Sequence, residues 1–167
     1  MERRHLDFRT LDDAVRDARQ LLQTGYEQTG QWNLSQVLGH CNDWLRFPLD
    51  GYPRVNFPIN FLLWMAKVTL GVGMRKKILR ERAFQAGSAT MPQTVKPPHH
   101  AQDSAALEQL ERTVERFKSH RGSLYPSPLF GKMTYEEHRE LQVIHLQHHL
   151  SFLVPKAKAA TILPRMR

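Results

Sequence analysis

The sequence has a single cysteine and no long hydrophobic run that is free of charge. Because Cys41 stands alone, it excludes an internal disulfide and any zinc site built from several cysteines. The charged N-terminus lacks a hydrophobic segment followed by a small-residue cleavage site, so we expect no signal peptide and a cytoplasmic protein. Internal repeats and alternating strand patterns are also missing. A metal ion would therefore have to be held by His, Asp or Glu.

Positive charge is in excess. The chain has 24 Lys and Arg against 16 Asp and Glu, a formal charge of +8 and a pI of about 10.0. Such a balance favours contact with nucleic acid or with a membrane surface. No helix-turn-helix or zinc-finger pattern supplies base recognition, so we expect no specific nucleic-acid partner. The length of 167 residues suits one domain over 1–167, with a frayed basic tail at 156–167.

Four segments have the apolar periodicity of amphipathic helices. They cover residues 10–24, 33–47, 103–120 and 134–154. Pro48 is expected to stop the second segment, and Pro155 to close the last. Cys41 falls on the second helix, where a small buried thiol is expected. These segments predict an all-α protein that folds as an antiparallel four-helix bundle.

Residues 50–102 form a long insertion between the second and third bundle helices. Residues 59–82 are strongly apolar at first and then basic, which allows two interpretations. In the first, they form one helix or two short helices, bent near Gly71 and Gly73, that pack on the bundle. In the second, they form an interfacial membrane helix with a basic end. Residues 87–102 predict a Pro-rich loop, in which His99 and His100 would be solvated.

The stretch "HLQHH" at residues 145–149 places two histidines on the inward face of the last helix. His145 and His149 are one turn apart, about 6 Å along the axis and about 40° around it. Such a pair can direct both imidazoles at one ion. His148 falls on the flank of the same face, and an exchange of its role with that of His149 stays open. His138 also lies near this face, closer to the helix start, where we expect a rim or exposed residue.

A metal site needs at least one more ligand, and His40 on the second helix is the best candidate. It lies at the edge of that helix's apolar face. Three histidines with an open position would be similar to a catalytic zinc site, and imidazole also suits nickel, iron or copper. The alternative is that these are ordinary core histidines held by hydrogen bonds.

The order of these motifs resembles the DinB-like superfamily. The resemblance rests on "LSQVLGHC" in the second helix and "FGKMTYEEHRELQVIHLQHHLSFL" in the last, with His40, His145 and His149 at the family's three histidine positions and His148 as the extra histidine. It covers about residues 10–154 and is closest to a branch without a named biochemical role. It implies a four-helix bundle that binds a divalent metal, commonly zinc or nickel. The insertion 50–102 departs from the pattern.

The resemblance also implies chemistry with low-molecular-weight thiols. We therefore expect a metal-dependent thiol transferase, isomerase or hydrolase acting on a small molecule. Asp43, Glu137 and His148 are candidates for groups that support the metal ligands. The alternatives are a binding module without turnover and a membrane-peripheral protein that uses its basic surface. Homodimer formation is left open.

Overall fold

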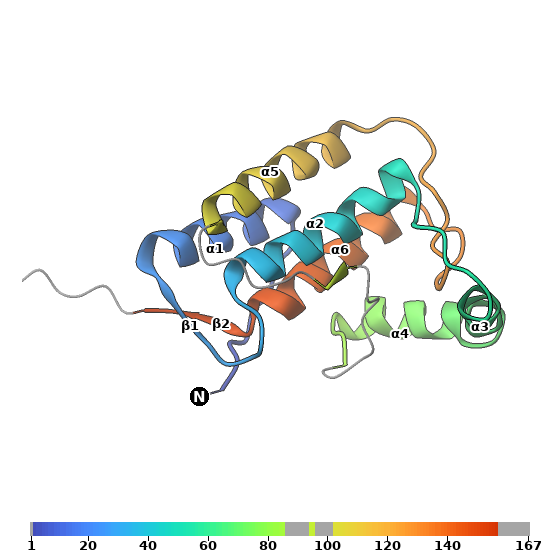
Figure 1. The fold of residues 1–167 in the computed structure, drawn as a ribbon, viewed down its shortest axis with the longest axis horizontal. Helices are drawn as coiled ribbons and strands as arrows, with labels where there is room; N and C mark the ends of the chain where they lie inside the picture. The colour runs from blue at the N-terminus through green and yellow to red at the C-terminus, as the bar shows by residue number, and fades with distance from the viewer. Residues whose placement is uncertain (1, 86–93, 96–101, 157–167) are drawn as a thin grey trace, which may run out of the picture.

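The computed structural model describes residues 2–85, 94–95 and 102–156. The described chain is mostly helical, with one small two-stranded sheet (Figure 1). In chain order the elements are α1 (Leu11–Thr24), β1 (Tyr26–Gln28), α2 (Leu34–Asp50), α3 (Ile59–Ala66), the π-helical turn η1 (Lys67–Gly71), α4 (Val72–Glu81), α5 (Asp103–Ser119), α6 (Tyr135–Leu150) and β2 (Leu153–Pro155). In the described part of the chain, the helices fall short of the length and apolarity needed to cross a bilayer.

Helices α1, α2, α5 and α6 pack around one apolar core, which we call the four-helix core. Three of these helices begin at the residues that the sequence indicates. Thr10, Asn33 and Thr134 each accept a hydrogen bond from the third helical residue, whose own side chain accepts one in return from the cap backbone. These capping boxes fix where the amphipathic segments start, and so which residues face the core. The predicted buried thiol of Cys41 is confirmed, because this residue belongs to the core cluster.

The predicted antiparallel bundle holds only in part, because α2 and α5 run in the same direction (Figure 1). At their starts, the backbone N–H of Ser35 donates to the carboxylate of Asp103. At their ends, Arg116 pairs with Asp50. Short loops force antiparallel neighbours, whereas the long connection 51–102 carries the chain back to the starting end before α5 begins.

The other helix pairs complete the arrangement. Helices α1 and α6 are parallel, since Arg139 at the start of α6 donates to the carbonyl of Arg9, and Lys156 beyond its end donates to the carbonyl of Gly25. Helix α6 runs antiparallel to α2, as Figure 1 shows. Residues near the end of α6 therefore lie beside residues near the start of α2, which determines the position of the candidate site.

Two predicted helix ends were wrong. Pro48 lies inside α2, which continues to Asp50. Proline cannot donate to the carbonyl of Trp44 four residues earlier, and this carbonyl accepts a hydrogen bond from the Gln142 side chain at 3.0 Å instead. Helix α6 ends at Leu150, and β2 pairs antiparallel with β1 over three residue pairs. These strands, only three residues long, show no alternating pattern in the sequence, so the all-α prediction missed them.

The insertion contains α3, η1 and α4, and its two ends behave differently. Helix α4 packs on α6 through a second apolar cluster of Ile78, Phe130, Leu141 and Ile144. Helix α3 lies at the edge of the molecule (Figure 1), and every one of its residues is at least partly exposed. The interpretation that the insertion packs on the bundle is therefore confirmed for α4 and not for α3.

The expected bend at the glycines takes the form of a π-helical turn that ends at Gly71. A Cβ atom at Gly71 would overlap the carbonyl oxygen of Leu129, so glycine is required for this close approach. A Cβ atom at Gly73 would have no neighbour within 4 Å. Most of the predicted Pro-rich loop 87–102, with His99 and His100, and most of the tail 156–167 lie outside the described residues.

Candidate metal centre

Three imidazole rings meet where α2 and α6 cross. The Nε2 atom of His145 lies 3.2 Å from Nε2 of His40 and 3.1 Å from Nε2 of His149. One nitrogen from each ring falls within 4.8 Å of the other two. His40 and His145 are more than a hundred positions apart in the sequence, and their Nε2 atoms nevertheless meet at one point.

The helical framework explains this convergence. His145 and His149 share one face of α6, one turn apart, and the antiparallel α2 presents His40 to the same face. His40 and His145 are buried, with 1% and 8% of their surface exposed, and His149 is half-buried. The cluster is therefore part of the protein interior, and His149 forms its most accessible side.

Two-centre hydrogen bonds leave this arrangement one partner short. The Nδ1 atom of His40 lies 3.2 Å from the carbonyl oxygen of Thr94, which can only accept, so the neutral ring carries its proton on Nδ1 and points the Nε2 lone pair at the cluster. The Nε2 atom of His145 has two nitrogen neighbours but only one proton or one lone pair to offer. A cation that accepts one lone pair from each ring would resolve the conflict.

The surroundings favour neutral rings. Burial lowers the pKa of His145 well below its ordinary value, and the neighbouring histidines His149, His40 and His148 lower it further. Burial also lowers the pKa of His149 to about 2, with smaller contributions from His40 and His148. Neutral imidazole is the form that binds metal ions, so these rings need not lose a proton at neutral pH to act as ligands.

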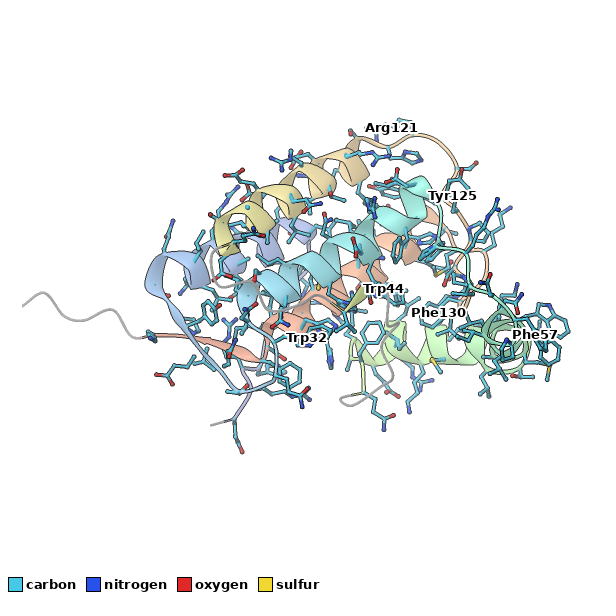
Figure 2. The ribbon with its side chains drawn as sticks, viewed as in Figure 1. Trp32, Trp44, Phe57, Arg121, Tyr125 and Phe130 are labelled. Atoms are coloured by element: carbon cyan, nitrogen blue, oxygen red, sulfur yellow. The ribbon has the colours of Figure 1, made fainter. Side chains whose placement is uncertain are left out.

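Aromatic side chains enclose the cluster. Trp32 stacks on His149, with ring centroids 5.3 Å apart and planes at 12°. Trp44 and Phe84 lie against His145, at 5.2 and 5.5 Å. Figure 2 shows the two tryptophans beside α2 and α6. The low polarity of these walls strengthens electrostatic interactions within the cluster.

None of these three aromatic residues was assigned to the site from the sequence. Trp44 could have been found, because it lies one helical turn after His40 on the same face of α2. Trp32 lies in the loop before α2, and Phe84 lies in the segment after α4, where no periodicity indicates a partner. Thr94, the acceptor for His40, was likewise not predicted.

His148 lies on the flank of the cluster, as its position on the helical wheel predicted. Its ring centroid is 5.0 Å from that of His149, and the ring also contacts Phe152. It also lines a pocket of about 190 Å³ together with Arg3, Arg4, Arg82 and Glu81, in which Arg4 pairs with Asp17 and Arg82 with Glu140. Burial, followed by the charge of Arg3, lowers the pKa of His148. This residue therefore joins the histidine cluster to this pocket.

The two carboxylates named from the sequence have other partners. Asp43 is buried on α2, and its carboxylate lies 3.7 Å from the guanidinium of Arg46. Glu137 belongs to the capping box at the start of α6 and lies 3.5 Å from Arg75. It is two turns before His145, about 12 Å along the helix axis. Its described contacts are therefore those of a helix cap.

His138 corrects another expectation, because it is buried and not at a rim. Only 1% of its surface is exposed, and neither ring nitrogen has a hydrogen-bond partner among the described residues. Burial lowers its pKa to about 4, with Glu137 acting in the opposite direction and Arg75 in the same direction. Since it lies two turns before His145, it is outside the three-histidine cluster.

The described chain is thus a mostly helical protein whose core buries a three-histidine cluster lined by aromatic side chains. It belongs to the family described as "Protein of unknown function (DUF1569)", whose model matches residues 1–156. Neither the curated proteins nor the solved structures contain a match to it.

Proposed function

We propose that the protein binds a divalent metal ion through the Nε2 atoms of His40, His145 and His149. The observation that carries this proposal is the pair of 3.1 and 3.2 Å distances between these atoms. Two nitrogen ligands bound tetrahedrally at roughly 2.0–2.1 Å from a zinc ion are about 3.3 Å apart. These two separations therefore fit ligands of one ion, the third pair of ligand atoms lies within 4.8 Å, and zinc or nickel suits the all-imidazole set.

The hydrogen bond from His40 to Thr94 supports the proposal. Metal-ligating histidines commonly donate their second ring N–H to a carbonyl or carboxylate, which fixes both tautomer and ring orientation. His40 has this partner. The order of the ligands, one on α2 and an H-x-x-x-H pair on α6, is also the pattern that resembles the DinB-like superfamily, so we propose a DinB-like bundle as well.

We further propose that the site serves a metal-dependent enzyme that uses a low-molecular-weight thiol, as a transferase, isomerase or hydrolase. A bound divalent ion lowers the pKa of a coordinated water or thiol and so supplies a nucleophile. Cys41 is unsuited to this role, since it is buried and burial raises the pKa of its thiol. In the pocket beside His148, the guanidinium of Arg3 is suited to an acidic group of a cosubstrate.

Elemental analysis of purified, untagged protein tests the metal site. We expect one zinc or nickel per chain in the wild type, and none in His145→Ala or His149→Ala, with helicity by circular dichroism largely intact. His120→Ala, which changes a histidine of the loop after α5, serves as the matched control and should keep its metal. Metal retained by both site variants would show that the ligands were chosen wrongly.

Activity assays separate an enzyme from a binding module. Metal-loaded protein is incubated with low-molecular-weight thiols and a panel of electrophiles, and product is followed by mass spectrometry. The proposal expects turnover that is lost in His145→Ala. A protein that binds stoichiometric metal and shows no turnover with any thiol would instead be the binding module considered above.

A further inference from the structure

The segment from Phe57 to Met74, here called the apolar segment, exposes large hydrophobic side chains at high density. Each of these exposes between 40% and 78% of its surface. They are Phe57, Ile59, Phe61, Leu62, Trp64, Met65, Val68, Leu70, Val72 and Met74. Scattered hydrophobic residues are normal on a protein surface, whereas a continuous apolar patch marks a place where something binds.

The direction of these side chains indicates what covers them. At about 100° per residue, Ile59 and Phe61 point to nearly opposite sides of α3. Leu62 lies between them on one side, and Trp64 lies between them on the other. A folded partner, including a second copy of this chain, presents a surface that covers one side of a helix. Lipid acyl chains can surround a helix on several sides, and therefore fit this distribution better.

The charge pattern points to the same partner. Residues 51–80 contain no Asp or Glu, and they contain six basic residues: Arg54, Lys67, Arg75, Lys76, Lys77 and Arg80. Lys76 and Lys77 are exposed and directly follow the apolar segment. Basic residues next to an inserted apolar helix are attracted to anionic headgroups.

The length of the segment decides how deeply it can insert. Helix α3 has eight residues and is about 12 Å long, and the chain turns after it, since Figure 1 shows α3 end-on and α4 lengthwise. A transmembrane helix needs roughly 20 predominantly apolar residues. Trp64 also suits the interface between headgroups and acyl chains, where tryptophan is enriched. The geometry therefore fits a helix that lies in one face of a bilayer.

We propose that the apolar segment docks into the surface of a membrane that contains anionic lipids, with Lys76 and Lys77 beside the headgroups. The four-helix core remains outside the bilayer, joined to the segment by α4, which packs on α6. Figure 2 shows Phe57 beside α3, at a distance from Trp32 and Trp44 at the histidine cluster. Docking would therefore leave the candidate metal centre uncovered.

Vesicle flotation tests the proposal. The full chain is mixed with vesicles of phosphatidylcholine alone, or of phosphatidylcholine with phosphatidylglycerol. We expect most of the wild-type protein to float with the anionic vesicles, and the double variant Phe61→Glu/Leu62→Glu to lose nearly all of this binding. The matched control is Leu22→Glu, which changes an exposed leucine on α1 and should float as the wild type does. Lys76→Glu/Lys77→Glu should lower the bound fraction severalfold.

Quenching by brominated lipid locates the contact. The fluorescence of the wild type should be partly quenched by anionic vesicles that carry bromine on the acyl chains. Trp64→Phe should bind equally well but lose this quenching, because Trp32 and Trp44 lie at the histidine cluster. Failure of the wild type to float with anionic vesicles would overturn the proposal. If it also sediments as a dimer that Phe61→Glu/Leu62→Glu converts to monomer, the apolar segment is a protein interface.

Discussion

The histidine cluster and the apolar segment depart from the usual distribution of residues in opposite ways. Between α2 and α6 the chain buries polar imidazoles, two of which are at most 8% exposed. Along α3 and η1 it exposes tryptophan, phenylalanine and leucine, which globular proteins ordinarily bury. Both departures cost free energy in the isolated chain, and each would be offset by a ligand of a different kind, a cation in one place and lipid in the other.

The difference also lies in how each region is held. The histidines extend from two helices of the four-helix core, whose packing fixes their positions before any ligand arrives. The apolar segment is attached through the close contact at Gly71 and the packing of α4 on α6, and α3 itself buries no residue. We therefore expect the first region to be rigid and the second to contribute little to the stability of the fold.

Matched leucine substitutions should give the largest contrast. Leu45→Ala removes a fully buried side chain from α2 and should lower the free energy of unfolding by roughly 2–5 kcal/mol. Leu62→Ala on α3, where 61% of the side chain is exposed, should change it by less than about 0.5 kcal/mol. Urea denaturation measures both values. A similar cost at the two positions would contradict the distinction between the regions.

Matched glycine substitutions test the attachment of the apolar segment. Gly71→Ala should lower the free energy of unfolding by about 1–3 kcal/mol, because its Cβ would overlap the carbonyl of Leu129. Gly73→Ala, two residues later and in open space, should raise it by up to about 1 kcal/mol, since alanine favours the helix. Thermal and urea denaturation would measure both. If Gly71→Ala were as stable as Gly73→Ala, the contact with Leu129 would not hold the segment.

The sequence predicted the helices of the core well, because their capping residues and apolar periodicity are local signals. It also singled out His40, His145 and His149, whose rings lie together in the structure. The inward orientation of the pair on α6 follows from helix geometry alone. The meeting with His40 depended on helix order, for which the position of His40 at the edge of its apolar face and the resemblance to a known family were the only indications.

The errors came from interactions between distant residues. The parallel direction of α2 and α5 depends on the path of a long connection. The extension of α2 past Pro48 leaves the carbonyl of Trp44 without its helical donor. Gln142, a residue of α6, donates to this carbonyl instead. The burial of His138 accompanies the packing of the insertion against α6, where Arg75 of α4 pairs with Glu137, the residue before His138. None of these contacts has a signature in the local sequence.

His138 gives a pH test in the part of α6 outside the cluster. The unfolded chain protonates this histidine below a pKa of about 6.5, whereas the folded chain keeps it neutral down to about 4. The unfolded state therefore binds more protons in this window, and stability falls as the pH falls. Between pH 6.5 and about pH 5.5, His138 should account for roughly 1 kcal/mol of that loss. His138→Leu should lose that much less stability than the wild type over the same interval, as measured by urea denaturation. Equal losses would show that the buried ring does not resist protonation.

His148 and His149 provide the smallest and sharpest comparison, since they are neighbours in sequence and their rings touch. The Nε2 atom of His149 faces the cluster, whereas His148 contributes an aromatic contact and lines the neighbouring pocket. His148→Ala should therefore keep one metal per chain and weaken its affinity only about twofold, equivalent to roughly 0.5 kcal/mol for a lost ring contact. His149→Ala should keep no stoichiometric metal. Equilibrium dialysis of both variants against zinc measures the difference, and loss of the metal from His148→Ala with retention in His149→Ala would exchange the roles of the two residues.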